Sequence, residues 1–214
     1  MGRLGYQSDA QAALAISYND LENYAASLHE GLTRIHPPYA AIGIRNPGGE
    51  YNQLATTLLQ IENEFYSAVR PKRVIRAGER PLHALRERGV EYVEVRCIDL
   101  DPFVPEGIEA STARFIDMFL LHCLLTESPR DTPREIAALA RNQDRVAASG
   151  REPGLMLERV EPVAGEVQLT AWAAQLLDEL VPIASALDAI QGGCAHRDSL
   201  ASAGAALRDL DSLP

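Results

Sequence analysis

The sequence predicts an α+β fold. Two segments of the first half, residues 61–66 and 91–97, alternate between polar and apolar side chains, as strands with one covered face do. The second half instead has apolar residues at helical spacing. The sequence has no repeating strand–helix pattern of the kind that builds a parallel sheet. We therefore expect a single partial domain over residues 1–214, strand-rich over about 1–105 and helical over about 106–214.

The first helix is expected soon after residue 17, because the residues before it have little periodicity. Asn19 and Glu22 form a capping-box pattern, and apolar residues then recur at helical spacing up to Leu32. The prolines of His36-Pro37-Pro38 are expected to end this helix. A short strand is predicted over residues 40–45, followed by a turn at Asn46-Pro47-Gly48-Gly49.

The second alternating segment carries charged residues on one of its faces. Val93, Val95 and Cys97 fall on the side that we interpret as the core side, whereas Glu94 and Arg96 fall on the other. Because they are two residues apart on a strand, Glu94 and Arg96 are about 6.5–7 Å apart. A helix over residues 80–88 precedes this strand, and Gly89 stands where a C-terminal cap belongs.

The second half is expected to consist of helices. Residues 115–125 are largely apolar and predict a helix that is buried on most sides. Thr132-Pro133-Arg134-Glu135 has the residues of a strong helix start. A further helix over residues 171–190 is expected to bend or break around Pro182 and to end at Gly192-Gly193.

Composition argues against several classes of protein. The net charge of −10 and the pI near 5.0 disfavour nucleic acid or an anionic membrane as the main partner, because both require a basic surface. No apolar run could span a bilayer and no signal peptide is recognisable, so we expect a cytoplasmic protein. Three cysteines without a Cys-x-x-Cys pair fit a reducing compartment.

Common catalytic motifs are absent from the sequence. It contains no P-loop, dinucleotide-binding or hydrolase-elbow pattern. The histidines have no metal-ligand spacing, and His122, in an apolar segment, is interpreted as a core histidine.

A group of positive charges precedes the strand that holds Glu94 and Arg96. It comprises Arg70, Lys72, Arg73, Arg76 and Arg80. A carboxylate and a guanidinium on one sheet face beside such a segment suit a metal-bound polyphosphate, because carboxylates bind hard cations and arginine binds phosphate through its planar fork. We therefore assign nucleotide contacts to Lys72, Arg70 and Arg73. The ordinary alternative is a solvated basic loop beside a surface ion pair.

Several motifs, in order along the chain, resemble one known family. They are Leu4-Gly5-Tyr6, Leu59-Gln60-Ile61-Glu62-Asn63-Glu64-Phe65-Tyr66, Arg70-Pro71-Lys72-Arg73-Val74, Glu91-Tyr92-Val93-Glu94-Val95-Arg96 and Asp101-Pro102-Phe103. The chain resembles the C-terminal part of bacterial glutamate–cysteine ligases of the gammaproteobacterial type. These enzymes make γ-glutamylcysteine, the first step to glutathione. The similarity runs from about Leu4 to Pro129 and continues more thinly to Gly193.

The resemblance implies a fold similar to glutamine synthetase, in which a curved antiparallel sheet carries the active site on its concave face. It implies that Glu94 is a ligand of Mg²⁺ and that Arg96 contacts the phosphoryl group during transfer. Tyr6 and Tyr66 match tyrosines that line the pocket for the incoming cysteine. In the implied reaction, ATP phosphorylates the γ-carboxylate of glutamate, and the cysteine amine then attacks the acyl phosphate.

The sequence also departs from the family pattern. Family members are more than twice this length, and the resemblance places most of their metal-binding carboxylates in an N-terminal half that this sequence lacks. Glu94 is therefore the one assigned ligand, and Glu62 and Glu64 are left without a role. We expect the 214-residue chain alone to be inactive and to self-associate through an incomplete sheet. The alternative is a stand-alone, non-catalytic domain that binds a nucleotide or a partner chain.

Overall fold

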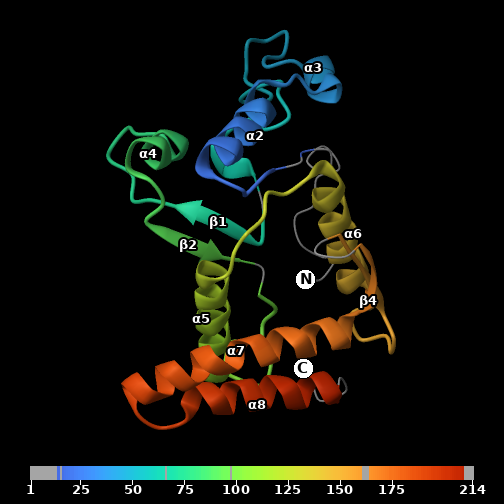
Figure 1. Cartoon of the computed structure of the whole chain (residues 1–214). Coiled ribbons are helices and arrows are strands. Elements are labelled where there is room, and N and C mark those ends of the chain that lie inside the picture. The colour runs from blue at the N-terminus through green and yellow to red at the C-terminus, as the bar shows by residue number, and fades with distance from the viewer. Residues whose placement is uncertain (1–13, 15, 66, 97, 161–163, 210–214) are drawn as a thin grey trace. The chain divides into compact units, whose positions relative to one another are not determined.

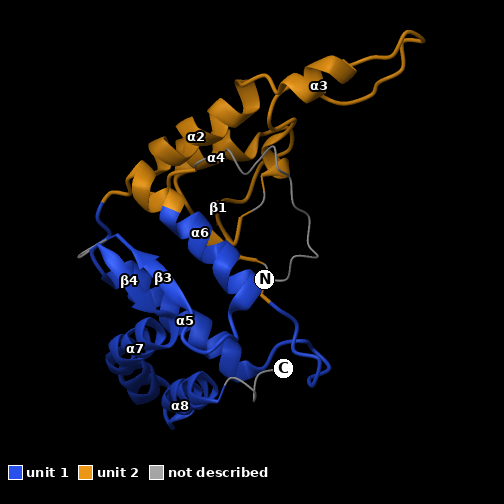
Figure 2. Cartoon of the chain, turned by 90° about the vertical axis from the view of Figure 1, so that its right-hand side faces the viewer, with its two compact units in different colours: residues 1–2, 99–129, 138–214 blue, residues 3–98, 130–137 orange. Residues whose placement is uncertain are grey.

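A computed structural model of the chain describes residues 14, 16–65, 67–96, 98–160 and 164–209. The chain forms two compact units (Figure 2). Unit 2 comprises residues 3–98 and 130–137, and unit 1 comprises residues 1–2, 99–129 and 138–214. Within the described residues, no helix is both long and apolar enough to cross a membrane.

Unit 2 combines helices with a two-stranded antiparallel hairpin (Figure 1). Its elements in chain order are α2 (Leu21–Thr33), α3 (Pro37–Ile42), the 3₁₀ helix η1 (Glu62–Glu64), β1 (Val69–Lys72), α4 (Pro81–Arg88) and β2 (Tyr92–Val95). In the hairpin, Val69 is paired with Val95 and Arg70 is paired with Glu94. Helix α4 lies in the connection between the two strands.

Two predictions for unit 2 are confirmed. Residues 81–88 form α4, and Gly89 ends it with a positive φ of 75°, a conformation that favours glycine. The strand expected within residues 91–97 is β2. Its partner, however, is β1, which is made from the basic segment itself.

Two predicted strands of unit 2 are wrong. Residues 62–64 form η1 instead, because the Glu64 carboxylate accepts a hydrogen bond from the Gln60 amide (2.5 Å) and closes a local turn. Residues 40–42 belong to α3, whose first turn holds two prolines, and the fixed φ of proline favours a helix start. In both places a short run of alternating or apolar residues did not distinguish strand from helix.

Helix α2 begins one residue later than the capping-box pattern predicted. Its N-cap is Asp20, whose Oδ1 accepts a hydrogen bond from the Asn23 amide at 2.7 Å. Asn19 instead pairs with Asp131: its side-chain amide donates to Asp131 Oδ1 at 2.8 Å, and its Oδ1 accepts from the Asp131 backbone amide at 2.6 Å. These bonds attach residues 130–137 to the start of α2, as their membership of unit 2 requires.

The core of unit 2 lies between α2, α4 and the segment that leads into η1. Leu59 is fully buried there, among Tyr24, Leu28, Phe65, Leu82 and Leu85. Helix α2 presents Gly31 to Leu59, and a Cβ at Gly31 would lie only 2.9 Å from Leu59 Cδ1. The close packing of α2 on Leu59 therefore requires the small residue.

We expect Leu59→Ala to lower the free energy of unfolding of unit 2 by about 2–5 kcal/mol, because it removes a fully buried side chain and leaves a cavity. The measurement is urea unfolding followed by circular dichroism, with hydrogen exchange of peptides from α2 and α4 as the local readout. Leu54→Ala is the matched control, since Leu54 is 68% exposed. Equal stability of the two variants would contradict the core described here.

Unit 1 is mainly helical. Its elements are α5 (Ala110–Leu125), α6 (Pro133–Ser149, whose first residues belong to unit 2), β3 (Met156–Arg159), β4 (Gly165–Gln168), α7 (Leu169–Gln191) and α8 (Ala195–Arg208). Strands β3 and β4 form an antiparallel hairpin in which Met156 is paired with Gln168. Helices α7 and α8 lie side by side, and α5 packs against both (Figure 1). Met118, Leu180, Ala184 and Leu200 form their shared core.

The predictions for unit 1 are partly confirmed. Helix α6 starts as expected, with the Glu135 amide donating to Thr132 Oγ1 at 3.2 Å, and α7 ends at Gly192, where φ is 82°. Helix α7 runs without interruption through Pro182, so a break there is wrong, whereas a bend stays a prediction. The burial of Leu180 and Ala184 on either side of the proline offsets the backbone hydrogen bond that it removes.

Helix α5 is less buried than expected. Of its described residues only Met118 is fully covered, and Leu124 is 78% exposed. The hairpin β3–β4 lies within the part expected to be helical, so the prediction is wrong there, whereas α8 falls in that part but was not predicted as a separate helix. Both depend on contacts with residues distant in the sequence: the Asn142 side chain of α6, for example, donates to the Glu158 carbonyl of β3 at 2.7 Å.

A buried carboxylate fixes the turn between α7 and α8. Asp188 Oδ1 accepts from the His196 amide at 2.9 Å and lies 2.9 Å from His196 Nδ1. Its Oδ2 accepts from the Arg197 amide at 3.2 Å and from Arg197 Nε at 3.0 Å. Burial favours a raised pKa for Asp188, but these hydrogen bonds outweigh it and hold the pKa well below its usual value.

This depressed pKa predicts an acid-sensitive contribution to stability. The stabilisation is fully present above the unfolded pKa of about 3.9 and is lost as the pH falls through the lower, folded pKa. We expect Asp188→Asn to lower the melting temperature of unit 1 at neutral pH by about 5 °C or more. We also expect it to lose less stability than the unmodified chain when the pH is lowered below about 4.

Fluorescence of Trp172, the one tryptophan of the sequence, follows the melting of α7 at each pH. Asp178→Asn is the control, because Asp178 is an exposed aspartate of the same helix. Parallel pH profiles for the unmodified chain and for Asp188→Asn would show that Asp188 does not supply the acid-sensitive contribution.

Candidate functional site

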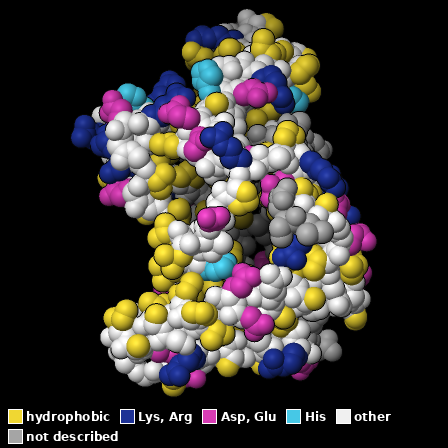
Figure 3. All heavy atoms as spheres, in the orientation of Figure 1, with side chains coloured by type: hydrophobic (Ala, Val, Ile, Leu, Met, Phe, Trp, Pro, Cys, Tyr) yellow, Lys and Arg dark blue, Asp and Glu magenta, His cyan; other side chains and the backbone are white. Residues whose placement is uncertain are grey.

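Charged side chains of both signs are interspersed over the described residues on the face seen in Figure 3. Charge density alone therefore does not locate a site. The hairpin β1–β2 is more specific, because its pairing brings charges of known position onto one face.

One face of the hairpin carries three cations around one carboxylate. Arg70 and Lys72 are two residues apart on β1 and therefore lie on the same face, and Glu94 lies directly opposite Arg70 on β2. Lys72 Nζ lies 3.5 Å from Glu94 Oε2, and Arg96 Nε lies 3.9 Å from the same oxygen. The Arg96 amide donates to the Ala68 carbonyl at 2.7 Å, which continues the strand pairing to this residue. The structure thus brings Arg70, Lys72, Glu94 and Arg96 together.

Arg70 is the most deeply buried of these cations. It is 8% exposed, and its Nε is a buried donor without a hydrogen-bond partner in the described part of the chain. The tyrosines Tyr18 and Tyr24, with ring centroids 5.5 Å apart, interact electrostatically with it. Burial raises the pKa of Tyr24, and the nearby Arg70 partly offsets this effect. A buried guanidinium is costly to leave without a compensating anion or acceptor.

Glu94 complements this unpaired donor. Its Oε2 is also buried, and it accepts no hydrogen bond from any described residue although two cations lie within 4 Å. Buried polar atoms in folded proteins are almost always hydrogen-bonded, so an exception calls for an explanation. A ligand that brings a cation to Glu94 and anionic oxygens to Arg70 would satisfy both atoms.

Arg73, the third predicted nucleotide contact, lies elsewhere. It follows Lys72 by one residue, and its guanidinium donates to the backbone carbonyls of Arg88 and Gly89, the latter at 3.1 Å. Its Nε lies 3.8 Å from the Glu91 carboxylate. These contacts satisfy carbonyls at the C-terminus of α4 and give Arg73 an evident structural role. Its nucleotide contact stays a prediction.

The two glutamates of η1 have backbone partners. Glu62 Oε2 accepts from the Leu82 amide at 2.8 Å and so satisfies a free donor in the first turn of α4. Glu64 Oε2 accepts from the Gln60 amide. Both contacts are structural and leave Glu94 as the carboxylate of the hairpin face that suits a cation.

Other sequence-based assignments are placed as follows. Tyr6, Tyr66 and Cys97 lie outside the described residues. His122 is mostly covered, and its Nε2 lies 3.3 Å from Glu179, in agreement with a partnered histidine. The contribution of Tyr24 to the site was missed, because its place in the apolar stripe of α2 indicated only a core residue.

Glu79, His83 and Glu87 form a carboxylate–imidazole cluster on and before α4. Both oxygens of Glu79 accept from Arg88, at 2.6 and 2.8 Å, which lowers the pKa of Glu79 to about 2. His83 and Glu87 form an exposed pair at 3.1 Å. The cluster is therefore an ion-pair network at the surface of α4.

Comparison with known proteins identifies relatives of this chain. The family model for glutamate–cysteine ligase matches residues 1–146. The glutamate–cysteine ligases of Pseudomonas fluorescens (strain Pf0-1) and Azotobacter vinelandii are each 46% identical over 214 residues, which is 100% of this chain and 40% of each relative. The chain therefore spans about 40% of the length of these curated relatives.

The structural comparison agrees. A crystal structure of glutamate–cysteine ligase from Francisella tularensis in complex with AMP matches 98% of this chain and 41% of its own, with a TM-score of 0.88 and 36% sequence identity. The α+β fold class predicted from the sequence is confirmed by this match and by the helices and antiparallel hairpins described above. From the family model and these relatives, we conclude that the chain belongs to the glutamate–cysteine ligase family.

Proposed function

We propose that this chain forms part of the active site of an ATP- and Mg²⁺-dependent ligase that joins glutamate to cysteine. The γ-carboxylate of glutamate attacks the γ-phosphorus of ATP and releases ADP. The cysteine amine then attacks the γ-glutamyl phosphate, forming the amide and releasing phosphate. Support comes from the hairpin face, where three cations surround one carboxylate and where a buried donor and a buried acceptor lack hydrogen-bond partners in the described residues.

Arg96 is the proposed catalytic residue. A guanidinium beside the phosphoryl group stabilises the negative charge on its oxygens most strongly in the transition state. Lys72, Arg70 and Arg73 are proposed to bind the nucleotide phosphates. The AMP complex of the Francisella tularensis relative supports a nucleotide site in this family.

Glu94 is the proposed metal ligand. The fit rests on its carboxylate, a hard oxygen ligand whose buried Oε2 accepts no hydrogen bond from the described residues. Mg²⁺ requires about six oxygen ligands, so one carboxylate must be joined by phosphate oxygens, water or further side chains. When bound there, the ion supplies charge neutralisation between the phosphates. Lys72 and Arg96, at 3.5 and 3.9 Å, hold the carboxylate in place.

The partners in this proposal are small molecules: glutamate, cysteine and ATP. Tyr6 and Tyr66 are proposed to bind the incoming cysteine. The supply of ATP and the free thiol of the substrate favour a cytoplasmic location. We also propose that the isolated chain self-associates through the hairpin, whose Val69 and Val93 are 39% and 44% exposed.

A chimeric enzyme tests the proposed function. The matching segment of the Pseudomonas fluorescens ligase is replaced by these 214 residues, and γ-glutamylcysteine formed from ATP, Mg²⁺, glutamate and cysteine is measured by mass spectrometry. We expect the chimera to form the product and the 214-residue chain alone to form none, because a single assigned carboxylate does not complete a metal site.

Turnover by the isolated chain would show that its site is complete and would contradict the predicted inactivity. A folded chimera that binds ATP but makes no γ-glutamylcysteine would favour the alternative, a non-catalytic nucleotide-binding domain. The cationic hairpin face gives that alternative its support.

A further inference from the structure

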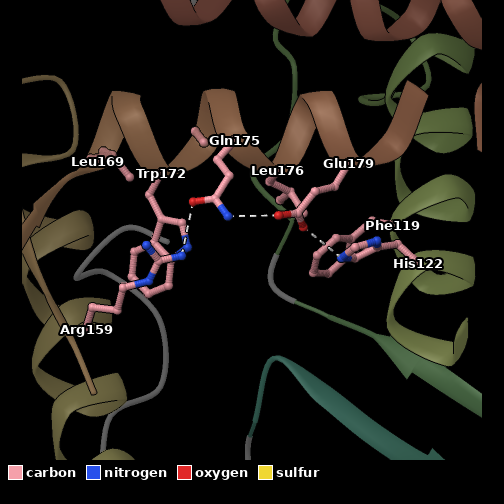
Figure 4. Close-up of a pocket in the computed structure, with 9 residues that line it drawn as sticks. Phe119, His122, Arg159, Leu169, Trp172, Gln175, Leu176 and Glu179 are labelled. Carbon is pink, nitrogen blue, oxygen red and sulfur yellow. Dashed lines mark hydrogen bonds and ion pairs between the residues drawn. The ribbon is translucent and has the colours of Figure 1, made fainter. Parts of the chain in front are cut away.

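Unit 1 contains a cavity of about 440 Å³ between α5, β3 and α7 (Figure 4). Among the described residues, none of those assigned above to the ligase reaction lines it. Its lining residues are Phe119 and His122 of α5, Arg159 of β3, and Leu169, Trp172, Ala173, Gln175, Leu176 and Glu179 at the start and middle of α7. Its volume lies in the range of small-molecule sites.

A continuous series of polar contacts runs along this cavity (Figure 4). Arg159 Nη2 donates to Gln175 Oε1 at 3.1 Å, and Gln175 Nε2 donates to Glu179 Oε1 at 2.8 Å. Glu179 Oε2 lies 3.3 Å from His122 Nε2. A guanidinium and a carboxylate are thus held one amide group apart, and Gln175 and His122 fix their positions.

Arg159, at one end of this series, has a hydrogen-bond donor that no described residue uses. The Arg159 guanidinium lies over the indole ring of Trp172, 5.0 Å from its centroid. Its Nε is buried and has no hydrogen-bond partner in the described part of the chain. Leaving such a donor unpaired is costly, and a carboxylate is the acceptor that the guanidinium fork fits best.

The remaining lining is apolar. Trp172 near Arg159, and Leu176 and Phe119 nearer His122, give the lining apolar surface that suits an aliphatic or aromatic group. Glu179, 44% exposed, is placed to accept a cation and to repel an anion of high charge such as a triphosphate. The site therefore combines one anion-binding group, one cation-binding group and an apolar wall.

We propose that this cavity binds an apolar α-amino acid in its zwitterionic form. The carboxylate of the amino acid pairs with Arg159, its ammonium group pairs with Glu179, and its side chain packs on Trp172 and its apolar neighbours. The span bridged by Gln175 matches a molecule whose two charged groups are separated by one carbon and that makes a hydrogen bond at each end. Its described lining shares no residue with the hairpin face that carries Arg70, Lys72, Glu94 and Arg96.

Fluorescence titration with L-leucine tests the proposal directly, because Trp172 is the one tryptophan of the chain and lines the cavity. We expect a saturable change in its emission. Leucinamide, which lacks the carboxylate, and 4-methylpentanoate, which lacks the ammonium group, should each bind about tenfold more weakly or worse. L-glutamate should bind weakly as well, since its side-chain carboxylate would meet the apolar wall.

Variants of the chain identify the two charged contacts. Arg159→Gln should abolish the preference for leucine over leucinamide, and Glu179→Gln should abolish the preference for leucine over 4-methylpentanoate. Asp178→Asn, at an exposed neighbour that does not line the cavity, should preserve both preferences. If a variant fails to fold, the analogue series on the unmodified chain still decides. No saturable change with leucine, or equal affinity for leucine and both analogues, would overturn the proposal.

Discussion

Replacing Arg96 with alanine in the chimeric ligase is expected to lower kcat by on the order of 100-fold or more, with a much smaller change in the KM for ATP. Arg96 lies on the cationic face of the hairpin, its backbone held by Ala68 and its Nε 3.9 Å from Glu94. A donor placed where charge develops stabilises the transition state more than the bound nucleotide, so its removal acts mainly on turnover.

The matched control for this variant is Arg86→Ala. Arg86 is an exposed arginine of the same unit, and its pairing with Glu22, at 3.7 Å, is an ordinary surface contact. Its removal should leave kcat unchanged. A rise in the KM for ATP with normal kcat in Arg96→Ala would show that Arg96 binds the nucleotide without acting on phosphoryl transfer.

Glu94→Gln is expected to have an effect of similar size, on the order of 100-fold in turnover. The amide keeps the size of the side chain but removes the charge that would bind Mg²⁺ and that now pairs with Lys72 and Arg96. The variant should therefore also require a higher Mg²⁺ concentration for half-maximal activity. A loss caused only by disturbed packing would leave the Mg²⁺ dependence unchanged.

Glu30→Gln serves as the control, since Glu30 is an exposed glutamate of α2 whose carboxylate pairs with Arg34, one turn along the chain, at 3.1 Å. Turnover and Mg²⁺ dependence should both be preserved in this variant. Normal activity of Glu94→Gln at low Mg²⁺ would remove Glu94 from the metal site.

Elements marked by local chemistry could be predicted from the sequence. The start of α6 at Thr132, the end of α4 at Gly89 and the end of α7 at Gly192 all follow from caps that act within one turn. The alternation of residues 61–65 had a different cause, because Glu62 and Glu64 bond to backbone amides of α4 and of Gln60. Hydrogen bonds between a side chain and a backbone amide of this kind cannot be recognised from the polar–apolar periodicity of the sequence.

The β3–β4 hairpin shows the same limit. Its strands have four residues each, too short for a clear alternating pattern. Contacts with α6 support β3: Arg141 and Arg145 both pair with Glu158, at 2.6 and 2.9 Å. Such contacts depend on the three-dimensional fold and become visible only in the structure.

The candidate site was predictable in part. The period of a strand places Glu94 and Arg96 on one face, as the sequence indicated. The pairing that sets Arg70 opposite Glu94 depends on which strand is adjacent, and the sequence indicated a strand at residues 61–66 but none at β1. Lys72 is the last residue of β1, and Arg73 follows the strand. The Arg73 guanidinium instead donates to carbonyls at the end of α4.

Positional isotope exchange tests most directly whether this hairpin face carries phosphoryl transfer. The chimera is incubated with Mg²⁺, glutamate and ATP that bears a heavy oxygen isotope in the bridge between the β- and γ-phosphates, with no cysteine present. Reversible transfer of the γ-phosphoryl group to glutamate frees the bridging oxygen to change places with the other β-oxygens, which phosphorus NMR of the recovered ATP detects. We predict scrambling of the label by the chimera and none by its Arg96→Ala variant. Scrambling at an undiminished rate in Arg96→Ala would contradict the role assigned to this face.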